Sequence, residues 1–208
     1  MKKQGCFISL EGIDGSGKTT LAAGLKQYFS TTGHPITCLR EPGGTTVSEA
    51  IRALLLNPDF SEMEPETEAF LYASARCQVR KQLIEPALKA GHIVLADRYT
   101  DSTLAYQGYG RGLSLPFLQE LNQLCTGGLL PDLTLLLDIS PEEAARRQTI
   151  RNAGKDRLEQ EGLLFQQKIC AGYQKLLAAN PERIIRLDAS LPPEELLQAA
   201  IQEIERRL

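Results

Sequence analysis

The sequence predicts an α/β protein in which a five-stranded parallel sheet carries helices on both faces. Short apolar runs alternate along the 208 residues with longer segments whose apolar residues recur at helical spacing. The run at 133–139 is apolar on both faces, which is typical of a strand in a covered parallel sheet. No linker interrupts this alternation, so we expect residues 1–208 to form a single domain.

The expected elements follow one another in regular order, and glycine or proline marks most of their boundaries. The expected strands are 6–10, 36–39, 92–96, 133–139 and 183–187. The expected helices are 18–30, 47–56, 65–90, 101–126 in pieces, 141–151, 157–179 and 193–208. Gly33 and Gly91 follow helix ends, and Pro65 and Pro141 stand where helices begin. Pro86 falls inside the third helix and predicts a kink there.

Composition excludes several classes of function. The chain has 23 Lys and Arg against 26 Asp and Glu, a formal charge of -3, which argues against broad binding to nucleic acid or an anionic membrane. There is no run of about 20 apolar residues and no apolar stretch typical of a signal peptide. Five scattered cysteines without a CxxC pair indicate free thiols in a reducing compartment. We therefore expect a cytoplasmic protein.

The strongest motif directly follows the first expected strand. It fits G-x-x-x-x-G-K-[ST], the phosphate-binding P-loop, and it reads Gly12-Ile13-Asp14-Gly15-Ser16-Gly17-Lys18-Thr19, followed by Thr20. Its glycines let backbone N–H groups approach phosphate oxygens, and the N-terminus of the next helix adds positive charge. In this motif Lys18 reaches the β- and γ-phosphates and Thr19 ligates Mg²⁺. The alternative is a plain glycine turn capped by threonine.

A second signal ends the strand at 92–96. Asp97 follows this buried run, and a carboxylate at the carboxyl end of a strand next to a P-loop is placed to ligate Mg²⁺. The alternative is a helix cap, or an ion pair with Arg98.

The acceptor of a phosphoryl group must be inferred from the rest of the chain. No N-K-x-D stretch for reading guanine occurs, which argues against a GTPase. Arg40 ends the second strand near the same sheet edge. Tyr72 and Arg76 are spaced i,i+4 on the third helix and share a face that could hold a nucleobase. Alternatively, Tyr72 is a core aromatic and Arg76 a surface charge. A different face of this helix, expected to be core, carries Phe70, Ala73, Cys77 and Ile84.

Taken together, the motifs resemble those of the thymidylate kinase family. They are, in order, FxxxEGxDGxGKTT, REPGGT, ETExFLYxxxR, DRYxxSTxAYQGxGR and RRxxxR…DRLE. The resemblance runs from residue 5 to at least residue 173 and implies the P-loop kinase fold. It implies phosphoryl transfer from ATP to dTMP, giving dTDP and ADP in the pathway to dTTP, with Mg²⁺ as cofactor and a homodimer as the assembly.

The resemblance also implies roles for individual residues on the acceptor side. Asp14 would hold the 3′-hydroxyl of dTMP and help organise Mg²⁺, and Arg40 and Arg98 would flank its phosphate. Tyr72 stands where the family usually has a phenylalanine stacked on thymine, and Arg76 would contact the base. Tyr106 would pack under C2′ of the sugar, and the candidates for further base contacts are Thr103 and Gln107.

The resemblance further implies a lid at about 147–157. Position 15 is glycine, where one branch of the family has a basic residue; the other branch takes its catalytic arginine from the lid. Arg151 is our first choice because it lies next to Asn-Ala-Gly, a hinge-like break, and Arg147 is the second. Arg157 would position the lid. The expected catalytic residues are thus Lys18, Arg98, Arg151 and Asp14.

Two rival functions fit part of these features. A deoxynucleoside kinase would use an acceptor without a phosphate, but Arg40 and Arg98 favour a phosphorylated one, because buried arginines need a partner. A nucleotide-binding regulatory module would bind without turnover, which the intact Lys18, Thr19 and Asp97 argue against. The expected mechanism is in-line transfer by positioning and charge neutralisation, without a general base.

Overall fold

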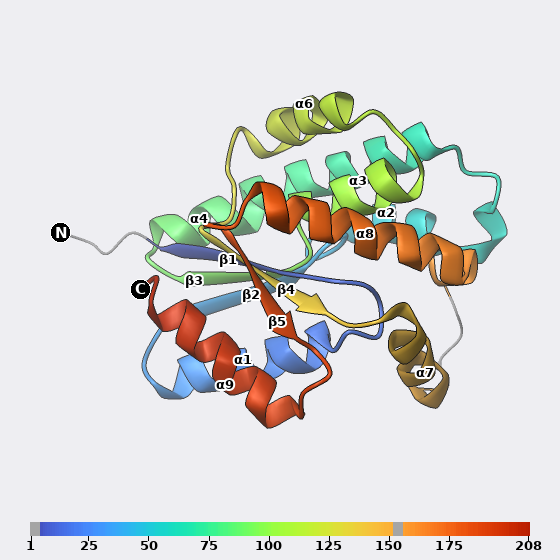
Figure 1. The fold of residues 1–208 in the computed structure, drawn as a ribbon. Helices are drawn as coiled ribbons and strands as arrows, with labels where there is room; N and C mark the ends of the chain where they lie inside the picture. The colour runs from blue at the N-terminus through green and yellow to red at the C-terminus, as the bar shows by residue number, and fades with distance from the viewer. Residues whose placement is uncertain (1–4, 152–155) are drawn as a thin grey trace.

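A computed structural model describes residues 5–151 and 156–208 of the chain, with the side chains of residues 150 and 151 outside the description. Its centre is a parallel sheet of five strands in the order β2-β3-β1-β4-β5 (Figure 1). The strands are β1 (Cys6–Glu11), β2 (Ile36–Arg40), β3 (Ile93–Asp97), β4 (Leu133–Asp138) and β5 (Ile184–Asp188). The predicted α/β fold is confirmed, and each expected strand lies within about one residue of its predicted bounds.

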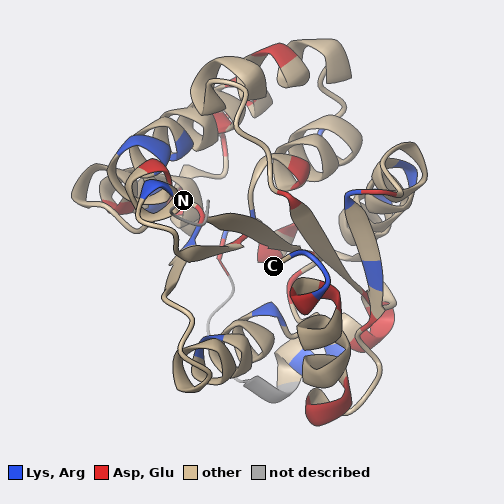
Figure 2. Cartoon of the chain, turned by 90° about the vertical axis from the view of Figure 1, so that its left-hand side faces the viewer, with Lys and Arg blue, Asp and Glu red and all other residues tan. Residues whose placement is uncertain are grey.

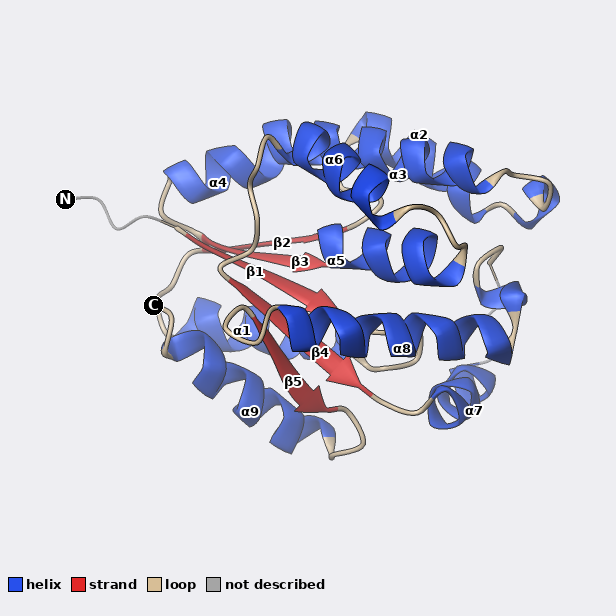
Figure 3. Cartoon of the chain, turned by 45° about the horizontal axis from the view of Figure 1, so that its top comes forward, coloured by secondary structure: helices blue, strands red, loops and turns tan. Residues whose placement is uncertain are grey.

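Helices cover both faces of the sheet (Figures 1 and 3). On one face α1 (Lys18–Thr31) packs against α9 (Pro193–Glu205). The other face carries α2 (Thr46–Leu56), α3 (Pro65–Val79), α4 (Glu85–Lys89), α5 (Thr100–Thr103), α6 (Leu115–Thr126) and α8 (Leu163–Ala179). The remaining helix, α7 (Pro141–Arg151), follows β4 and stands beyond the carboxyl end of the sheet.

The middle of the sheet is the core of the protein. Every residue of β1 is buried, and so are all but the last residues of β3 and β4, whereas the edge strands β2 and β5 are partly exposed. Continuous apolar runs are what a strand covered on both faces requires. Leu10 of β1 pairs with Asp97 of β3, so the segments that follow these two strands emerge side by side.

Two predicted helices are interrupted by π-helical turns. The range 65–90 is divided into α3 and α4 by a turn at Arg80–Ile84, just before Pro86. Proline lacks the N–H and crowds the preceding turn, which accounts for the wider hydrogen-bond spacing just before it. The range 101–126 is divided into α5, a π-helical turn at Leu104–Gly110, and α6, as expected for a helix in pieces.

Two predictions were wrong. The expected helix at 157–179 begins only at Leu163, after a short 3₁₀ turn and Gly162, whose φ of 81° breaks the helix. On α3, Phe70 is 51% exposed and Cys77 is also exposed, although both were expected in the core. The buried face of α3 instead carries the charged residues Glu68 and Arg76, and this turns Phe70 outward.

The distribution of charged side chains and the state of the cysteines agree with what the composition predicts. Lys and Arg are interspersed with Asp and Glu on the helices of both layers (Figure 2). All five cysteines lie in the described part of the chain, and each is a free thiol, as expected. Among the described helices, none combines the length and apolar character needed to span a bilayer.

Candidate active site

The P-loop joins β1 to α1 and wraps around an open cradle. Gly12, Gly15 and Gly17 have φ values of 139°, 86° and 97°, the left-handed region that glycine enters without a side-chain clash. Gly17 is the N-cap of α1 and no side chain caps the helix, so the first N–H groups of α1 face the cradle. Ser16 Oγ is buried and has no hydrogen-bond partner in the described residues. Such an orphaned polar group fits an anion that would satisfy it.

Lys18 is folded back onto this loop. It is only 6% exposed, and its Nζ donates to the carbonyl oxygens of Gly12 at 3.0 Å and Ile13 at 2.9 Å. Its Nζ lies 4.0 Å from Asp14 Oδ1. Burial, with Arg98 nearby, lowers the pKa of Lys18 to about 8. A phosphate entering the cradle would relieve this charge repulsion and reverse the shift.

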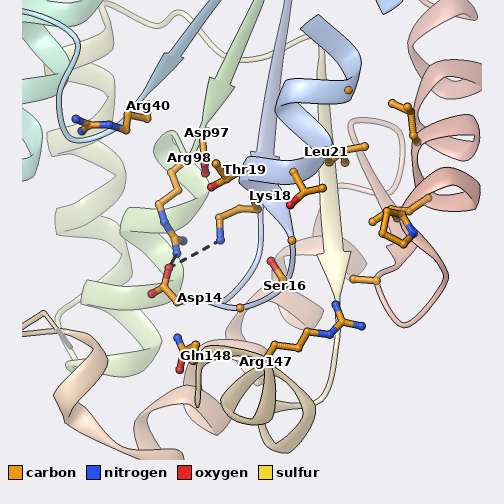
Figure 4. Close-up of a pocket in the computed structure, with 18 of the residues that line it drawn as sticks. Asp14, Ser16, Lys18, Thr19, Leu21, Arg40, Asp97, Arg98, Arg147 and Gln148 are labelled. Atoms are coloured by element: carbon orange, nitrogen blue, oxygen red, sulfur yellow. Dashed lines mark hydrogen bonds and ion pairs between the residues drawn. The ribbon is translucent and has the colours of Figure 1, made fainter. Parts of the chain in front are cut away.

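Asp14 and Arg98 form the central ion pair of the site. Arg98 Nη2 donates to Asp14 Oδ1 at 2.5 Å, and Nη1 donates to the carbonyl oxygen of Gly12 at 2.9 Å (Figure 4). Burial raises the pKa of Asp14, but Arg98 and Lys18 outweigh it and hold that pKa below its usual value. Arg98 has a φ of 75°, unusual for a residue with a side chain, and strain of this kind clusters at functional sites. The sequence also allowed an ion pair between Asp97 and Arg98. The structure does not show it, because Arg98 pairs with Asp14.

A large pocket of about 1000 Å³ lies over the P-loop. Asp97 and Arg98 border it on one side and Arg147 and Gln148 of α7 on another (Figure 4). Its far end is formed by α1 and the start of α9, a part that sequence reasoning missed, and this wall includes Gly24, Ala189, Leu191, Pro193 and Leu197. Nothing in the local pattern of this segment distinguishes it from an ordinary strand-to-helix connection.

Thr19 and Asp97 are the expected metal ligands, and both line this pocket. Thr19 lies in the first turn of α1 and Asp97 at the carboxyl end of β3 (Figure 4). Within the described residues no three His, Cys, Asp or Glu side chains gather into a ready-made metal cage. One hydroxyl and one carboxylate beside a phosphate cradle nevertheless fit Mg²⁺, which usually keeps waters and takes substrate phosphates as its other ligands.

A smaller pocket opens on the other side of Asp14 and Arg98, and it brings the predicted base and sugar residues together. Its lining includes Tyr72, Arg76, Thr103, Tyr106 and Gln107. The alternative of a surface charge at Arg76 is wrong, because Arg76 is 1% exposed. Burial lowers the pKa of Arg76, but the carboxylate of Glu41 outweighs it and raises that pKa overall.

Arg76 is held by an extended network. Its Nε donates to Glu41 at 2.7 Å, its Nη1 to Thr103 Oγ1 at 2.8 Å and Asn122 Oδ1 at 2.9 Å, and its Nη2 to the carbonyl oxygen of Tyr99 at 3.0 Å. These bonds use four of the five N–H groups of the guanidinium, which also hydrogen-bonds with the side chain of Cys125. The side chain is therefore fixed in place before any ligand binds.

Tyr106 contacts both Asp14 and Arg98, two residues that line both pockets. Its ring lies 4.8 Å from the guanidinium carbon of Arg98, and its hydroxyl is 3.4 Å from Asp14 Oδ2. Burial raises the pKa of Tyr106 well above its ordinary value. The ring is thus held next to the ion pair of Asp14 and Arg98. If Asp14 binds the sugar hydroxyl of an acceptor nucleotide, the sugar would lie beside this ring.

Arg40 and Arg98 are not brought together as a pair. The guanidinium of Arg40 donates to Glu49 Oε2 at 3.1 Å and to the carbonyl oxygen of Pro42 at 3.0 Å, and it points away from the cradle (Figure 4). Arg40 still lines the large pocket, whereas Arg52 of α2, which sequence reasoning missed, lines both pockets. The sequence pointed to Arg52 only through its place on the helix that follows Arg40.

The lid region lies against the P-loop. A Cβ placed on Gly15 would come within 2.5 Å of the carbonyl oxygen of Ala144 in α7, so a side chain at position 15 would collide with this helix. Arg147 lines the large pocket and pairs with Glu143 at 3.0 Å. Arg151 is the last residue of α7, but its side chain and residues 152–155 lie outside the described residues.

Comparison with known proteins places the chain in a family. The sequence profile of a family described as thymidylate kinase matches residues 10–201. The chain belongs to the thymidylate kinase family. The thymidylate kinase of Bacillus velezensis is 44% identical, covering 98% of this chain and 97% of that protein. The thymidylate kinase of Deinococcus radiodurans is 45% identical, with 96% and 98% covered.

The family's fold is also found here. A crystal structure of thymidylate kinase from Ehrlichia chaffeensis matches with a TM-score of 0.79 and 27% identity, over 97% of this chain and 99% of that one. The expected P-loop kinase fold is therefore confirmed.

Proposed function

We propose that this chain transfers a phosphoryl group from ATP to dTMP, giving dTDP and ADP, as a step towards dTTP. Its membership of the thymidylate kinase family supports this activity. The observation that carries the proposal is a shared wall: Asp14 and Arg98 line both the phosphate cradle and the smaller pocket. A donor in the first and an acceptor in the second would meet at this wall.

On the donor side, we assign the ATP phosphates to the P-loop, residues 12–20. Lys18 would leave its two carbonyl partners and follow the transferring phosphoryl group, where a cation stabilises the transition state. The wall formed by α1, α9 and Leu191 would hold the nucleoside part of ATP.

Thr19 and Asp97 would hold Mg²⁺, which supplies charge neutralisation to the phosphates when it is bound. The hydroxyl of Thr19 and the carboxylate of Asp97 face the same pocket, and both are oxygen ligands of the kind Mg²⁺ prefers. Asp14, held by Arg98, is kept ionised and would orient the 3′-hydroxyl of dTMP and the waters around the metal.

On the acceptor side, Tyr72 would stack on the thymine and Arg76 would contact the base. Arg98 would shift from Asp14 towards the dTMP phosphate. We assign Arg52 to the same phosphate, because it lines both pockets, and Arg40 would join only by releasing Glu49. Thr103, Tyr106 and Gln107 complete the pocket around the base and sugar.

We place the chain in the branch whose catalytic arginine comes from the lid, at about 147–157. The close approach of Gly15 to α7 supports this, because a basic side chain at position 15 would not fit beside Ala144. Arg151 remains the proposed catalytic arginine. Arg157, at the end of the lid, donates from Nε to the carbonyl oxygen of Leu55 at 2.9 Å and would position the lid.

One assay tests the activity against its rivals. Release of ADP from ATP and Mg²⁺ is followed with dTMP, dUMP, thymidine and dGMP as acceptors. We expect turnover with dTMP and little with thymidine, because Arg98 and Arg52 require a phosphate. Turnover with thymidine in place of dTMP would support a deoxynucleoside kinase, and binding without ADP release would support a regulatory module.

We also propose that residues 1–208 act as one domain, that two copies form a homodimer, and that the protein works in a reducing cytoplasm. Exposed apolar side chains on three adjacent helices support the dimer: Val47 and Leu54 of α2, Phe70 of α3 and Leu124 of α6. Sedimentation of the wild type and of Phe70→Glu tests it. We expect a dimer that the charged variant dissociates, and a wild-type monomer would exclude it.

A further inference from the structure

A fully buried carboxylate, Glu68 of α3, lies behind the smaller pocket. It is 0% exposed, and its Oε1 accepts from Gln107 Nε2 at 2.7 Å and from Arg111 Nε at 3.3 Å. Its Oε2 accepts from Arg111 Nη2 at 3.1 Å and from Arg157 Nη2 at 2.6 Å. One side chain thus joins α3, the π-helical turn at 104–110 and Arg157 at the end of the lid region.

The charges around this carboxylate are balanced. Arg111 and Arg157 face it, and Arg111 also pairs with Glu161 at 2.5 Å. Burial raises the pKa of Glu68, but the hydrogen bonds from Arg111 and Gln107 outweigh it and hold that pKa below its ordinary value. Glu68 is therefore ionised at neutral pH, and an ionised carboxylate only accepts hydrogen bonds.

This constraint fixes the amide of Gln107. An amide has a donating nitrogen at one end and an accepting oxygen at the other. The end that meets Glu68 must be the nitrogen, because the opposite orientation would set two acceptor oxygens against each other. Gln107 is 2% exposed and lines the smaller pocket, so its Oε1 is the end left for a ligand.

We propose that Glu68 is a specificity-determining positioning residue that locks the Gln107 amide so that the pocket presents a hydrogen-bond acceptor to the acceptor's base. This rests on the proposed function, in which the base of dTMP lies in this pocket. Thymine and uracil carry a donating N–H at N3, whereas cytosine has a lone pair there. A locked acceptor matches the first two bases and opposes cytosine, and a site with fixed polar groups rejects a mismatched base strongly.

The decisive variant is Glu68→Gln, which keeps the shape and removes the charge. Its single carbonyl oxygen would be taken by the arginines, and its NH₂ would face Gln107, which must then turn its nitrogen to the pocket. We expect the ratio of kcat/KM for dTMP over dCMP to fall by about tenfold or more, mainly through KM for dTMP. KM for ATP should stay the same.

Arg111→Met is the matched control for a merely structural role. Arg111 donates to the same carboxylate, and its side chain forms hydrogen bonds and ion pairs with Glu68 and Glu161. We expect this variant to lower Tm and leave the dTMP to dCMP ratio unchanged. If both variants lowered Tm and neither changed the kcat/KM ratio of dTMP over dCMP, Glu68 would have a structural role only. That result would overturn the proposal.

A double variant tests whether Glu68 acts through Gln107. Gln107→Met alone should lower the ratio, and adding Glu68→Gln to it should produce no further change, because residues that act through one another are not additive. An equal extra fall in the Gln107→Met background would overturn the proposal. If Glu68→Gln does not fold, an unchanged ratio in Gln107→Met would do so. A wild type that releases no ADP with dTMP would refute the proposed function instead.

Discussion

The two pockets that share Asp14 and Arg98 are built in different ways. The large pocket is shaped by backbone: three glycines with positive φ, the N-terminus of α1 and the carbonyl oxygens that hold Lys18. The smaller pocket is shaped by side chains, and its walls are tied to one another by buried hydrogen bonds, as at Arg76 and Glu68. Backbone conformation therefore shapes the large pocket, and side-chain hydrogen bonds hold the walls of the smaller one.

This difference predicts how each half responds to substitution. In the cradle, charged side chains such as Lys18 are proposed to act on the phosphates, so their loss should affect the rate. In the smaller pocket, a substitution should affect binding and selectivity, because each side chain there fixes its neighbours. The predictions below test this contrast.

The largest expected effect lies in the lid. Arg151→Ala should lower kcat by roughly 10³-fold, the low end for an arginine that neutralises the transferring phosphoryl group, with little change in Kd for dTMP. Steady-state kinetics and dTMP titration measure the two quantities. Arg151→Lys should recover only part of the rate, since lysine lacks the planar fork.

Arg147→Ala is the matched control for Arg151. Arg147 pairs with Glu143 on the same helix, so its loss should lower the rate less. An inactive Arg147→Ala beside an active Arg151→Ala would move the assignment one turn back along α7. Full activity in both would exclude a lid arginine and weaken the contrast drawn between the halves.

Lys18 tests the cradle itself. Lys18→Ala should reduce kcat to less than about a tenth of the wild-type value, while Kd for dTMP changes much less, because the lysine acts on the transferring group. Stopped-flow or coupled measurement of ADP release gives kcat. If the loss appeared mainly in dTMP affinity, the cradle and the smaller pocket would not be separable in the way proposed.

Tyr72 tests the smaller pocket. Tyr72→Ala should cost roughly 1–3 kcal/mol of dTMP binding through lost stacking, and Tyr72→Phe should be nearly silent. ATP affinity should hardly change, because Tyr72 lines only the smaller pocket. Isothermal titration with each nucleotide measures both affinities. Equal losses of affinity for dTMP and ATP would mean that Tyr72 is a core residue, an alternative consistent with its partial burial against the core.

The smallest effect is expected at the border between the halves. Glu11 directly precedes the P-loop, and its carboxylate accepts from the backbone N–H of Tyr99 at 2.8 Å, from Ser102 at 2.5 Å and from Tyr173 at 2.7 Å. Burial, with Asp101 nearby, raises the pKa of Glu11 from 4.5 to about 7, although Arg98 opposes this. Between these values the folded state binds more protons than the unfolded state, so this carboxylate lowers stability as pH rises to about 7.

Replacing Glu11 shows whether this slope exists. Glu11→Gln should flatten the fall in stability between pH 5 and pH 7, measured from urea midpoints without nucleotide. Tyr173→Phe, which removes one donor to the ionised carboxylate, should steepen it. Parallel curves for wild type and Glu11→Gln would mean that Glu11 stays ionised across this range.

The sequence by itself predicted the sheet, the P-loop motif after β1 and the position of Asp97 at the end of β3. Each of these is local: an apolar run predicts a covered strand, and the spacing of glycines, Lys18 and Thr19 carries its function in consecutive residues. Helical spacing predicted that Tyr72 and Arg76 share a face, and the family resemblance added Thr103, Tyr106 and Gln107. The structure gathers all five residues in one pocket.

Only the tertiary structure decided which partner each side chain takes. Arg40 pairs with Glu49 and lines only the large pocket, while Arg52 lines both pockets. Glu68 and Arg76 occupy the face of α3 that packs inward, and Phe70 is left outside. The reason is physical: a buried charge must find an opposite charge or hydrogen bonds, and its partner lies far away in sequence, as Arg157 does for Glu68. The local sequence around either residue does not indicate such a pairing.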